Sequence, residues 1–153
     1  MNTFTFSASA WLPLPIEKVF EFFSDAHNLE SLTPPFLKFR VITPDPIVMT
    51  AGTHIRYKLK LRGIPIHWES EITIWEPPDL FVDEQLHGPY RLWRHEHRFA
   101  ARDGGTEVSD HVEYAVFGGS LINRLLVAPD VRKIFAYRQS KLSELLLPSS
   151  ARP

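Results

Sequence analysis

The amino-acid sequence predicts an α+β fold, in which a curved antiparallel sheet of about seven strands wraps around a long C-terminal helix, with two short helices after the first strand. Three observations carry this prediction. Apolar and polar residues alternate along the middle of the chain, as in strands with one buried face. Turns rich in Pro, Gly and Asp separate these stretches. The final part changes to the apolar spacing of an amphipathic helix.

The chain starts with a strand and two short helices. MNTFTFSASAW (residues 1–11) alternates and lacks the basic and apolar regions of a signal peptide. Pro15 suits a first helical turn, and Ile16, Val19 and Phe20 follow at helical spacing. A second short helix is expected to end before the TPP segment (33–35).

Further strands should form a meander. Those predicted are FLKFRVI (36–42), THIRYKLKLRG (53–63), IHWESEITIW (66–75), LFVDEQLH (80–87), RLWRHEHRFAAR (91–102) and TEVSDHVEYAVF (106–117). In the third of these, Trp68, Ser70, Ile72 and Ile74 share the predicted inner face. DGG (103–105) predicts a tight hairpin between the last two strands.

The C-terminal helix should cover the inner face of this sheet. Its predicted apolar stripe comprises Leu121, Ile122, Leu125, Leu126, Val131, Ile134, Phe135, Leu142 and Leu145. Pro129 should kink or split the helix. Arg132, Lys133 and Arg138 are expected on the surface, although Arg138 is near enough to the stripe to reach a ligand carboxylate. Because a straight helix cannot fill a curved sheet everywhere, we expect a cavity between them.

Composition indicates one globular domain. The chain has 153 residues, of which 44% are hydrophobic and 23% charged. We expect residues 1–147 to form the domain and residues 148–153 to form a tail. A net charge of −1, with no block of like charge, predicts no nucleic-acid partner, and no apolar run is long enough for stable membrane insertion. The cysteine-free chain is expected in the cytoplasm, as a monomer or homodimer.

Three segments carry a resemblance to a known superfamily: YRLWRHEHRF, GGTEVSDHVEY and FAYRQSKLSELL. With the element order, they resemble the START-like superfamily, which includes birch-pollen-type allergens, lipid-transfer domains and polyketide cyclases, and more narrowly its bacterial ligand-binding SRPBCC-type proteins. The resemblance runs from about Phe4 to Leu146. It implies a helix-grip fold with a deep pocket between sheet and helix, but no shared catalytic motif.

Polar side chains are unusually frequent on the predicted inner face. Alternation places Arg94, Glu96 and Arg98 toward solvent and His95 and His97 inward. An unpaired buried polar group costs about 1–3 kcal/mol, so such a set must be hydrogen-bonded, hydrated or in contact with a ligand. The candidate ligand-binding residues are Tyr57, Trp68, Ser70, Asp83, Gln85, Trp93, His95, His97, Asp110 and Tyr114.

Four roles are open for this polar set. It could be a structural network in which Asp83 and Asp110 orient the imidazoles, or it could bind the polar end of an apolar ligand. His95 and His97 could also bind a metal with Asp110 as carboxylate ligand. Finally, either histidine could act as a general base with Asp110. A module that binds another subunit instead would have a filled cavity.

We predict that the protein binds or transports a small hydrophobic molecule, without catalytic residues, bound metal or cofactor. The alternative is a cyclase- or hydratase-like enzyme that uses the inward His/Asp pair. The sequence contains no nucleophile, phosphate-loop or cofactor motif, which favours the first reading.

Overall fold

A seven-stranded antiparallel sheet is the central element of the fold. The computed structural model describes residues 1–147, so the predicted tail lies outside the described residues. The strand order is β1-β7-β6-β5-β4-β3-β2, and each neighbouring pair is antiparallel. The strands are β1 (Phe4–Leu12), β2 (Arg40–Val41), β3 (His54–Leu61), β4 (Ile64–Glu76), β5 (Leu80–His87), β6 (Leu92–Arg102) and β7 (Gly105–Ala115).

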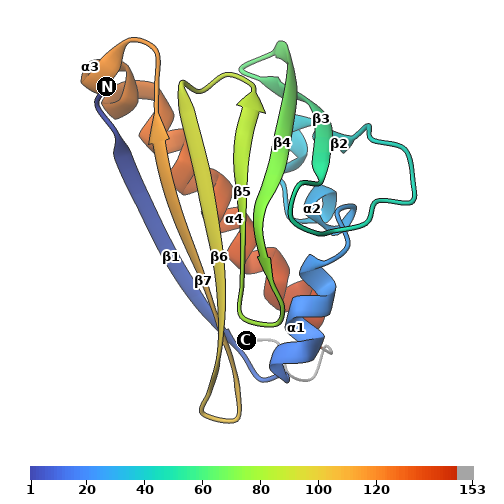
Figure 1. Ribbon diagram of the computed structural model, residues 1–153. Coiled ribbons are helices and arrows are strands. Elements are labelled where there is room, and N and C mark those ends of the chain that lie inside the picture. Colours follow the sequence, from blue (N-terminus) through green and yellow to red (C-terminus); the bar gives the residue numbers. More distant parts are fainter. Residues whose placement is uncertain (148–153) are drawn as a thin grey trace.

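Helices lie on one side of this sheet. They are α1 (Ile16–Phe23), α2 (Asn28–Ser31), the 3₁₀ helix η1 (Pro35–Leu37), α3 (Gly119–Ile122), the π-helix η2 (Asn123–Val127) and α4 (Ala128–Leu146). The long helix α4 crosses one face of the curved sheet (Figure 1). Helix α1 packs against β6 and β7, α2 contacts α1, and η1 lies against β3. This architecture confirms the predicted helix-grip fold.

The segment predicted as strand 36–42 is mostly not a strand. Only Arg40 and Val41 pair with β3, while Pro35–Leu37 forms η1. Proline favours the first turn of a helix, and Lys38 ends that turn in the left-handed conformation, with φ 48°. The alternation of this segment therefore does not reflect sheet pairing.

A bulge shifts the face of β4 that meets the core. The register between β4 and β5 changes between Ile72 and Ile74, so Trp75 rather than Ile74 lies opposite Phe81. The Trp75 ring packs against Phe20 and Phe81, with centroid distances of 5.0 and 5.4 Å. The prediction that Ile74 faces the core is wrong, because one extra residue reverses the alternation.

The predicted hairpin at DGG is confirmed. Arg102 pairs with Gly105, which leaves a two-residue loop of Asp103 and Gly104. Both loop residues have positive φ, 52° and 76°, as a type I′ turn requires. The tight turn connects the two strands that carry the inward histidines and Asp110.

The predicted irregularity of the C-terminal helix near Pro129 is a π turn, and the helix is not split there. Pro129 lies in the first turn of α4, directly after the π-helix η2. Val131, Phe135 and Leu142 on α4 are buried. The first part of the predicted stripe is wrong, and so is its last residue: Leu121, Leu125, Leu126 and Leu145 are exposed. A π turn holds more residues than an α turn, so α3 and η2 do not continue the apolar face of α4.

Two clusters of buried side chains form the core. One gathers aromatic rings of α1, β5 and β6, including Phe20, Phe81 and Phe99; the other packs Val112 and Tyr114 of β7 against Phe135 of α4. Among residues 1–147, no helix is both long and apolar enough to cross a membrane.

Candidate functional site

A cavity of about 170 Å³ lies between α4, the inner face of the sheet and the segment of α2 and η1. An engineered cavity of about 150 Å³ in another protein binds benzene, so this space is sufficient for a small ring-containing molecule. Most lining side chains are apolar. They include Leu29, Leu32, Phe39, Met49, Ile55, Leu59, Ile72, Val131, Ile134 and Phe135.

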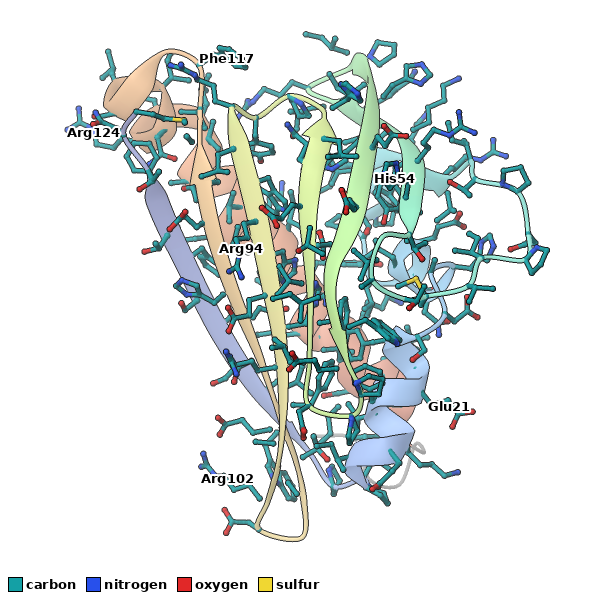
Figure 2. All side chains as sticks on the ribbon, in the orientation of Figure 1. Glu21, His54, Arg94, Arg102, Phe117 and Arg124 are labelled. Atoms are coloured by element: carbon teal, nitrogen blue, oxygen red, sulfur yellow. The ribbon has the colours of Figure 1, made fainter. Side chains whose placement is uncertain are left out.

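Seven of the ten predicted site residues line this cavity. They are Tyr57, Trp68, Ser70, Asp83, Trp93, His95 and His97. The predicted phase of β6 is confirmed, because His95 and His97 are 6% and 4% exposed whereas Arg98 is exposed. Arg94, labelled in Figure 2, lies on the opposite face of β6 and pairs with Glu96.

Three predicted residues do not line the cavity. The Gln85 amide donates to the backbone oxygen of Tyr90 at 2.8 Å and accepts from its N–H at 3.1 Å, so it holds the turn before β6. The Tyr114 hydroxyl donates to Oδ1 of Asn123 at 2.8 Å. Asp110 lies behind the histidines, where it contacts them without lining the cavity.

A polar cluster lies against the cavity and comprises the buried side chains His95, His97, Asp110 and Arg138 and the half-buried Asp83. Nε2 of His95 is 2.7 Å from Oδ1 of Asp110, and Nε2 of His97 is 2.6 Å from Oδ2 of Asp83. The imidazole rings stack with centroids 3.6 Å apart. Because an ionised carboxylate only accepts hydrogen bonds, each histidine carries its proton on Nε2.

Arg138 of α4 completes the polar cluster, and the expectation that it lies on the surface is wrong. It is 5% exposed and lines the cavity. Its Nη2 lies 3.4 Å from Nδ1 of His97 and 3.6 Å from Oδ1 of Asp110. Its Nε is buried without a hydrogen-bond partner among the described residues.

The position of Arg138 was visible in the sequence. It follows Val131 by seven residues and precedes Leu142 by four, which places it on the buried face of the helix. The guanidinium lies over Phe23 and Phe135, with 5.3 and 5.9 Å to the ring centroids. The helical spacing of Arg138 therefore predicts its burial correctly, whereas its residue type does not.

His97 is held neutral. Burial lowers its pKa, as do neighbouring His95 and Arg138, and these effects outweigh Asp83 and bring the pKa to about 4. Nε2–H of the neutral ring donates to Asp83, and Nδ1 accepts from Arg138. Both nitrogens of His97 thus have partners within the protein.

Both carboxylates of the polar cluster are ionised. Burial alone would raise the pKa of Asp110, but Arg138 and the hydrogen bond from His95 hold this pKa below its usual range. Burial alone would also raise the pKa of Asp83, but the hydrogen bond from His97 holds the pKa of this carboxyl below its usual range. The polar cluster therefore holds two carboxylates and one guanidinium.

One atom each from Asp83, His95 and His97 lie within 4.8 Å of one another, close enough to hold a divalent cation. Asp83 therefore takes the place of the carboxylate ligand that the sequence predicts at Asp110. In the present arrangement each Nε2–H is bonded to a carboxylate and the Arg138 cation contacts His97. These contacts favour a hydrogen-bonded cluster over metal ligation.

Comparisons with known proteins agree with this architecture. The family model of polyketide cyclase / dehydrase and lipid transport proteins matches residues 12–135. Protein CV1439 from Chromobacterium violaceum is similar in structure, with a TM-score of 0.74 and 15% identity over 95% of this chain and 99% of that chain. Major latex-like protein 151 from Panax ginseng gives a TM-score of 0.71 and 10% identity over 95% and 99% of the two chains. At these identities the likeness shows the fold alone. The search of curated proteins finds no significant match.

Proposed function

The chain belongs to the polyketide cyclase / dehydrase and lipid transport family, and on this premise we propose that it binds or transports a small, mostly apolar molecule in the cavity beneath α4. The family match and the fold confirm the resemblance to START-like proteins. We further propose that the protein acts in the cytoplasm, consistent with its cysteine-free sequence.

The observation that carries this proposal is the contrast between the walls of the cavity. Its apolar side chains would remove a ring or short chain from water, while Asp83, His95, His97 and Arg138 form one polar wall. A purely structural network would be expected to satisfy all its groups internally, yet Nε of Arg138 has no partner among the described residues. The polar wall is therefore well suited to the polar end of a ligand.

Binding can be tested by NMR titration with methyl phenyl ketone. We expect saturable shifts at cavity-lining residues such as Trp68, Trp93 and Phe135. Ile134→Trp should abolish these shifts, because Ile134 lines the cavity and the larger ring would fill it.

Leu125→Trp is the matched control, because Leu125 is 58% exposed and lies just before α4, outside the cavity. This variant should bind the ketone like the original protein. Shifts confined to the outer surface, or the absence of saturable binding, would overturn the proposal.

A second candidate, a proton-transferring cyclase- or hydratase-like enzyme, is favoured by one feature of His95. Its Nε2–H is oriented by Asp110, whereas Nδ1 has no hydrogen-bond partner among residues 1–147 and the side chain lines the cavity. This is the arrangement of an oriented general base. His97 is less suited to that role because both its nitrogens are engaged.

Deuterium exchange separates binding from catalysis. In deuterated buffer, a base in the cavity would accelerate exchange of the methyl protons of methyl phenyl ketone, and His95→Asn would remove the acceleration. We expect the exchange rate to equal that of buffer alone, since binding is the primary proposal.

A further inference from the structure

We infer that the ligand's polar end is uncharged and carries an acceptor oxygen and a hydroxyl group within a few bonds of each other, as in a hydroxy ketone. This inference rests on the proposed function and names the chemical class of the ligand. It follows from the hydrogen-bonding capacity that the polar cluster leaves unused.

The acceptor oxygen is required by Arg138. A guanidinium has five N–H donors, but among residues 1–147 the only hydrogen bond of this one is the 3.4 Å contact from Nη2 to His97. Its ion pair with Asp110 is long, at 3.6 Å. A buried cation with so few partners is costly unless another acceptor is present. Because Arg138 lines the cavity, a ligand oxygen is the natural acceptor.

The hydroxyl group is required by His95. Its Nε2–H donates to Asp110, so in the neutral ring Nδ1 is an acceptor, and none of the described residues donates to it. Two side chains contact both groups. The ring of His97 stacks on His95 at 3.6 Å and lies 3.4 Å from Nη2 of Arg138, and Oδ1 of Asp110 is 2.7 Å from His95 and 3.6 Å from Arg138. The ligand's donor and acceptor must therefore be close together.

Charge excludes a carboxylate as the preferred head group. Asp83 and Asp110 are both within the cluster, and Arg138 is the single guanidinium beside them. An anionic ligand would place a third negative charge in a poorly solvated space, where repulsion between like charges is strong. A neutral carbonyl oxygen satisfies Arg138 without this repulsion.

Four probes of similar size distinguish these requirements: ethylbenzene, methyl phenyl ketone, hydroxymethyl phenyl ketone and benzoate. The dissociation constant of each is measured by NMR titration at pH 7. Hydroxymethyl phenyl ketone should bind about tenfold more tightly than methyl phenyl ketone, the effect of one buried hydrogen bond, and benzoate should bind more weakly than either.

Two variants assign the contacts. Arg138→Met keeps the apolar stem and should weaken binding of methyl phenyl ketone about tenfold while changing ethylbenzene less than about twofold. His95→Phe should abolish the preference for hydroxymethyl over methyl phenyl ketone. Arg132→Met, an exposed position on α4, is the control and should change neither ratio.

The probe series on the unmodified protein decides the inference even if Arg138→Met does not fold. Equal binding of ethylbenzene and both ketones would overturn the inference and leave the proposed function intact. Benzoate as the tightest probe would likewise overturn it, because the site would then select an anion. If no probe binds, the proposed function fails and the inference fails with it.

Discussion

His95 and His97 are two residues apart on β6, yet their environments give them different chemistry. His97 lies between the rings of Phe81 and His95, with centroid distances of 3.9 and 3.6 Å, and both its nitrogens have protein partners. His95 has one partnered nitrogen and lies against the cavity. The same residue type therefore supports the cluster at one position and is available to a ligand at the other.

Replacing His97 by Ala should reduce stability more than binding. The change removes the stacked ring and the hydrogen bond to Asp83, leaving a half-buried carboxylate without this donor. We expect a loss of about 2–4 kcal/mol in the free energy of unfolding. Urea denaturation measures it, and His111→Ala, at an exposed position on β7, provides the control. A loss no greater than that of the control would contradict the structural role of His97.

The lowered pKa of His97 predicts a dependence of stability on pH. In the unfolded chain histidine has its ordinary pKa of 6.5, whereas in the fold the pKa of His97 is about 4. Between these values the unfolded state binds more protons, so the free energy of unfolding falls as pH decreases from about 6.5 to about 4, by roughly 3 kcal/mol. Urea denaturation at several pH values measures the slope.

His97→Gln should make this slope shallower, since glutamine does not titrate. The ionised Asp83 and Asp110 also lose stabilising interactions in acid, but their lowered pKa values place that loss mainly below pH 4. An unchanged slope in the variant would show that His97 is not the titrating group.

At the scale of elements, the C-terminal helix shows where a local apolar pattern predicts side-chain burial and where it does not. Its buried residues follow the helical period, so Val131, Phe135 and Leu142 were predicted correctly. The burial of the residues before α4 does not follow this period, because the π-helix η2 changes the phase of the helix. In β4 the bulge had the same effect, and placed Trp75 in the core instead of Ile74. The spacing of apolar residues therefore predicts the wrong buried face where the backbone accommodates one extra residue that no sequence motif marks.

The candidate site shows the same limit. The inward phase of His95 and His97 follows from alternation within one strand. Alternation does not predict which carboxylate each histidine contacts, because the hydrogen bonds run diagonally between strands. His95 is paired with Asp83 in the sheet register, but its hydrogen bond is to Asp110. Such choices depend on side-chain geometry between strands, which no local period encodes. The charge of Arg138 predicts an exposed side chain, but its helical position places it on the buried face of α4.

Variants of two leucines test the change of helical phase between η2 and α4. Leu142→Ala should cost about 2–5 kcal/mol in the free energy of unfolding, because Leu142 is 1% exposed in the core. Leu125→Ala should cost less than about 1 kcal/mol, since that side chain is largely in solvent. Chemical denaturation of both variants compares them, and equal losses would be inconsistent with the helix phase in the structure.

At the scale of the whole molecule, the curved sheet and α4 enclose a cavity whose polar wall is held together by hydrogen bonds among its own side chains. Elemental analysis of the purified protein should therefore find no divalent metal near one equivalent. Adding Zn²⁺ should raise the melting temperature no more in the original protein than in His95→Phe, which lacks one potential ligand. A stoichiometric metal, or stabilisation that depends on His95, would contradict the hydrogen-bonded cluster.

We propose that the cavity beneath α4 receives a small apolar molecule with its polar end at Arg138 and His95. A crystal structure of the protein with hydroxymethyl phenyl ketone would reveal this placement. We expect the phenyl ring among the apolar lining residues, the ketone oxygen within about 3 Å of the Arg138 guanidinium and the hydroxyl within about 3 Å of Nδ1 of His95. A ring bound outside the cavity, or bound inside it with both oxygens directed away from the polar cluster, would show that the polar cluster does not bind the ligand.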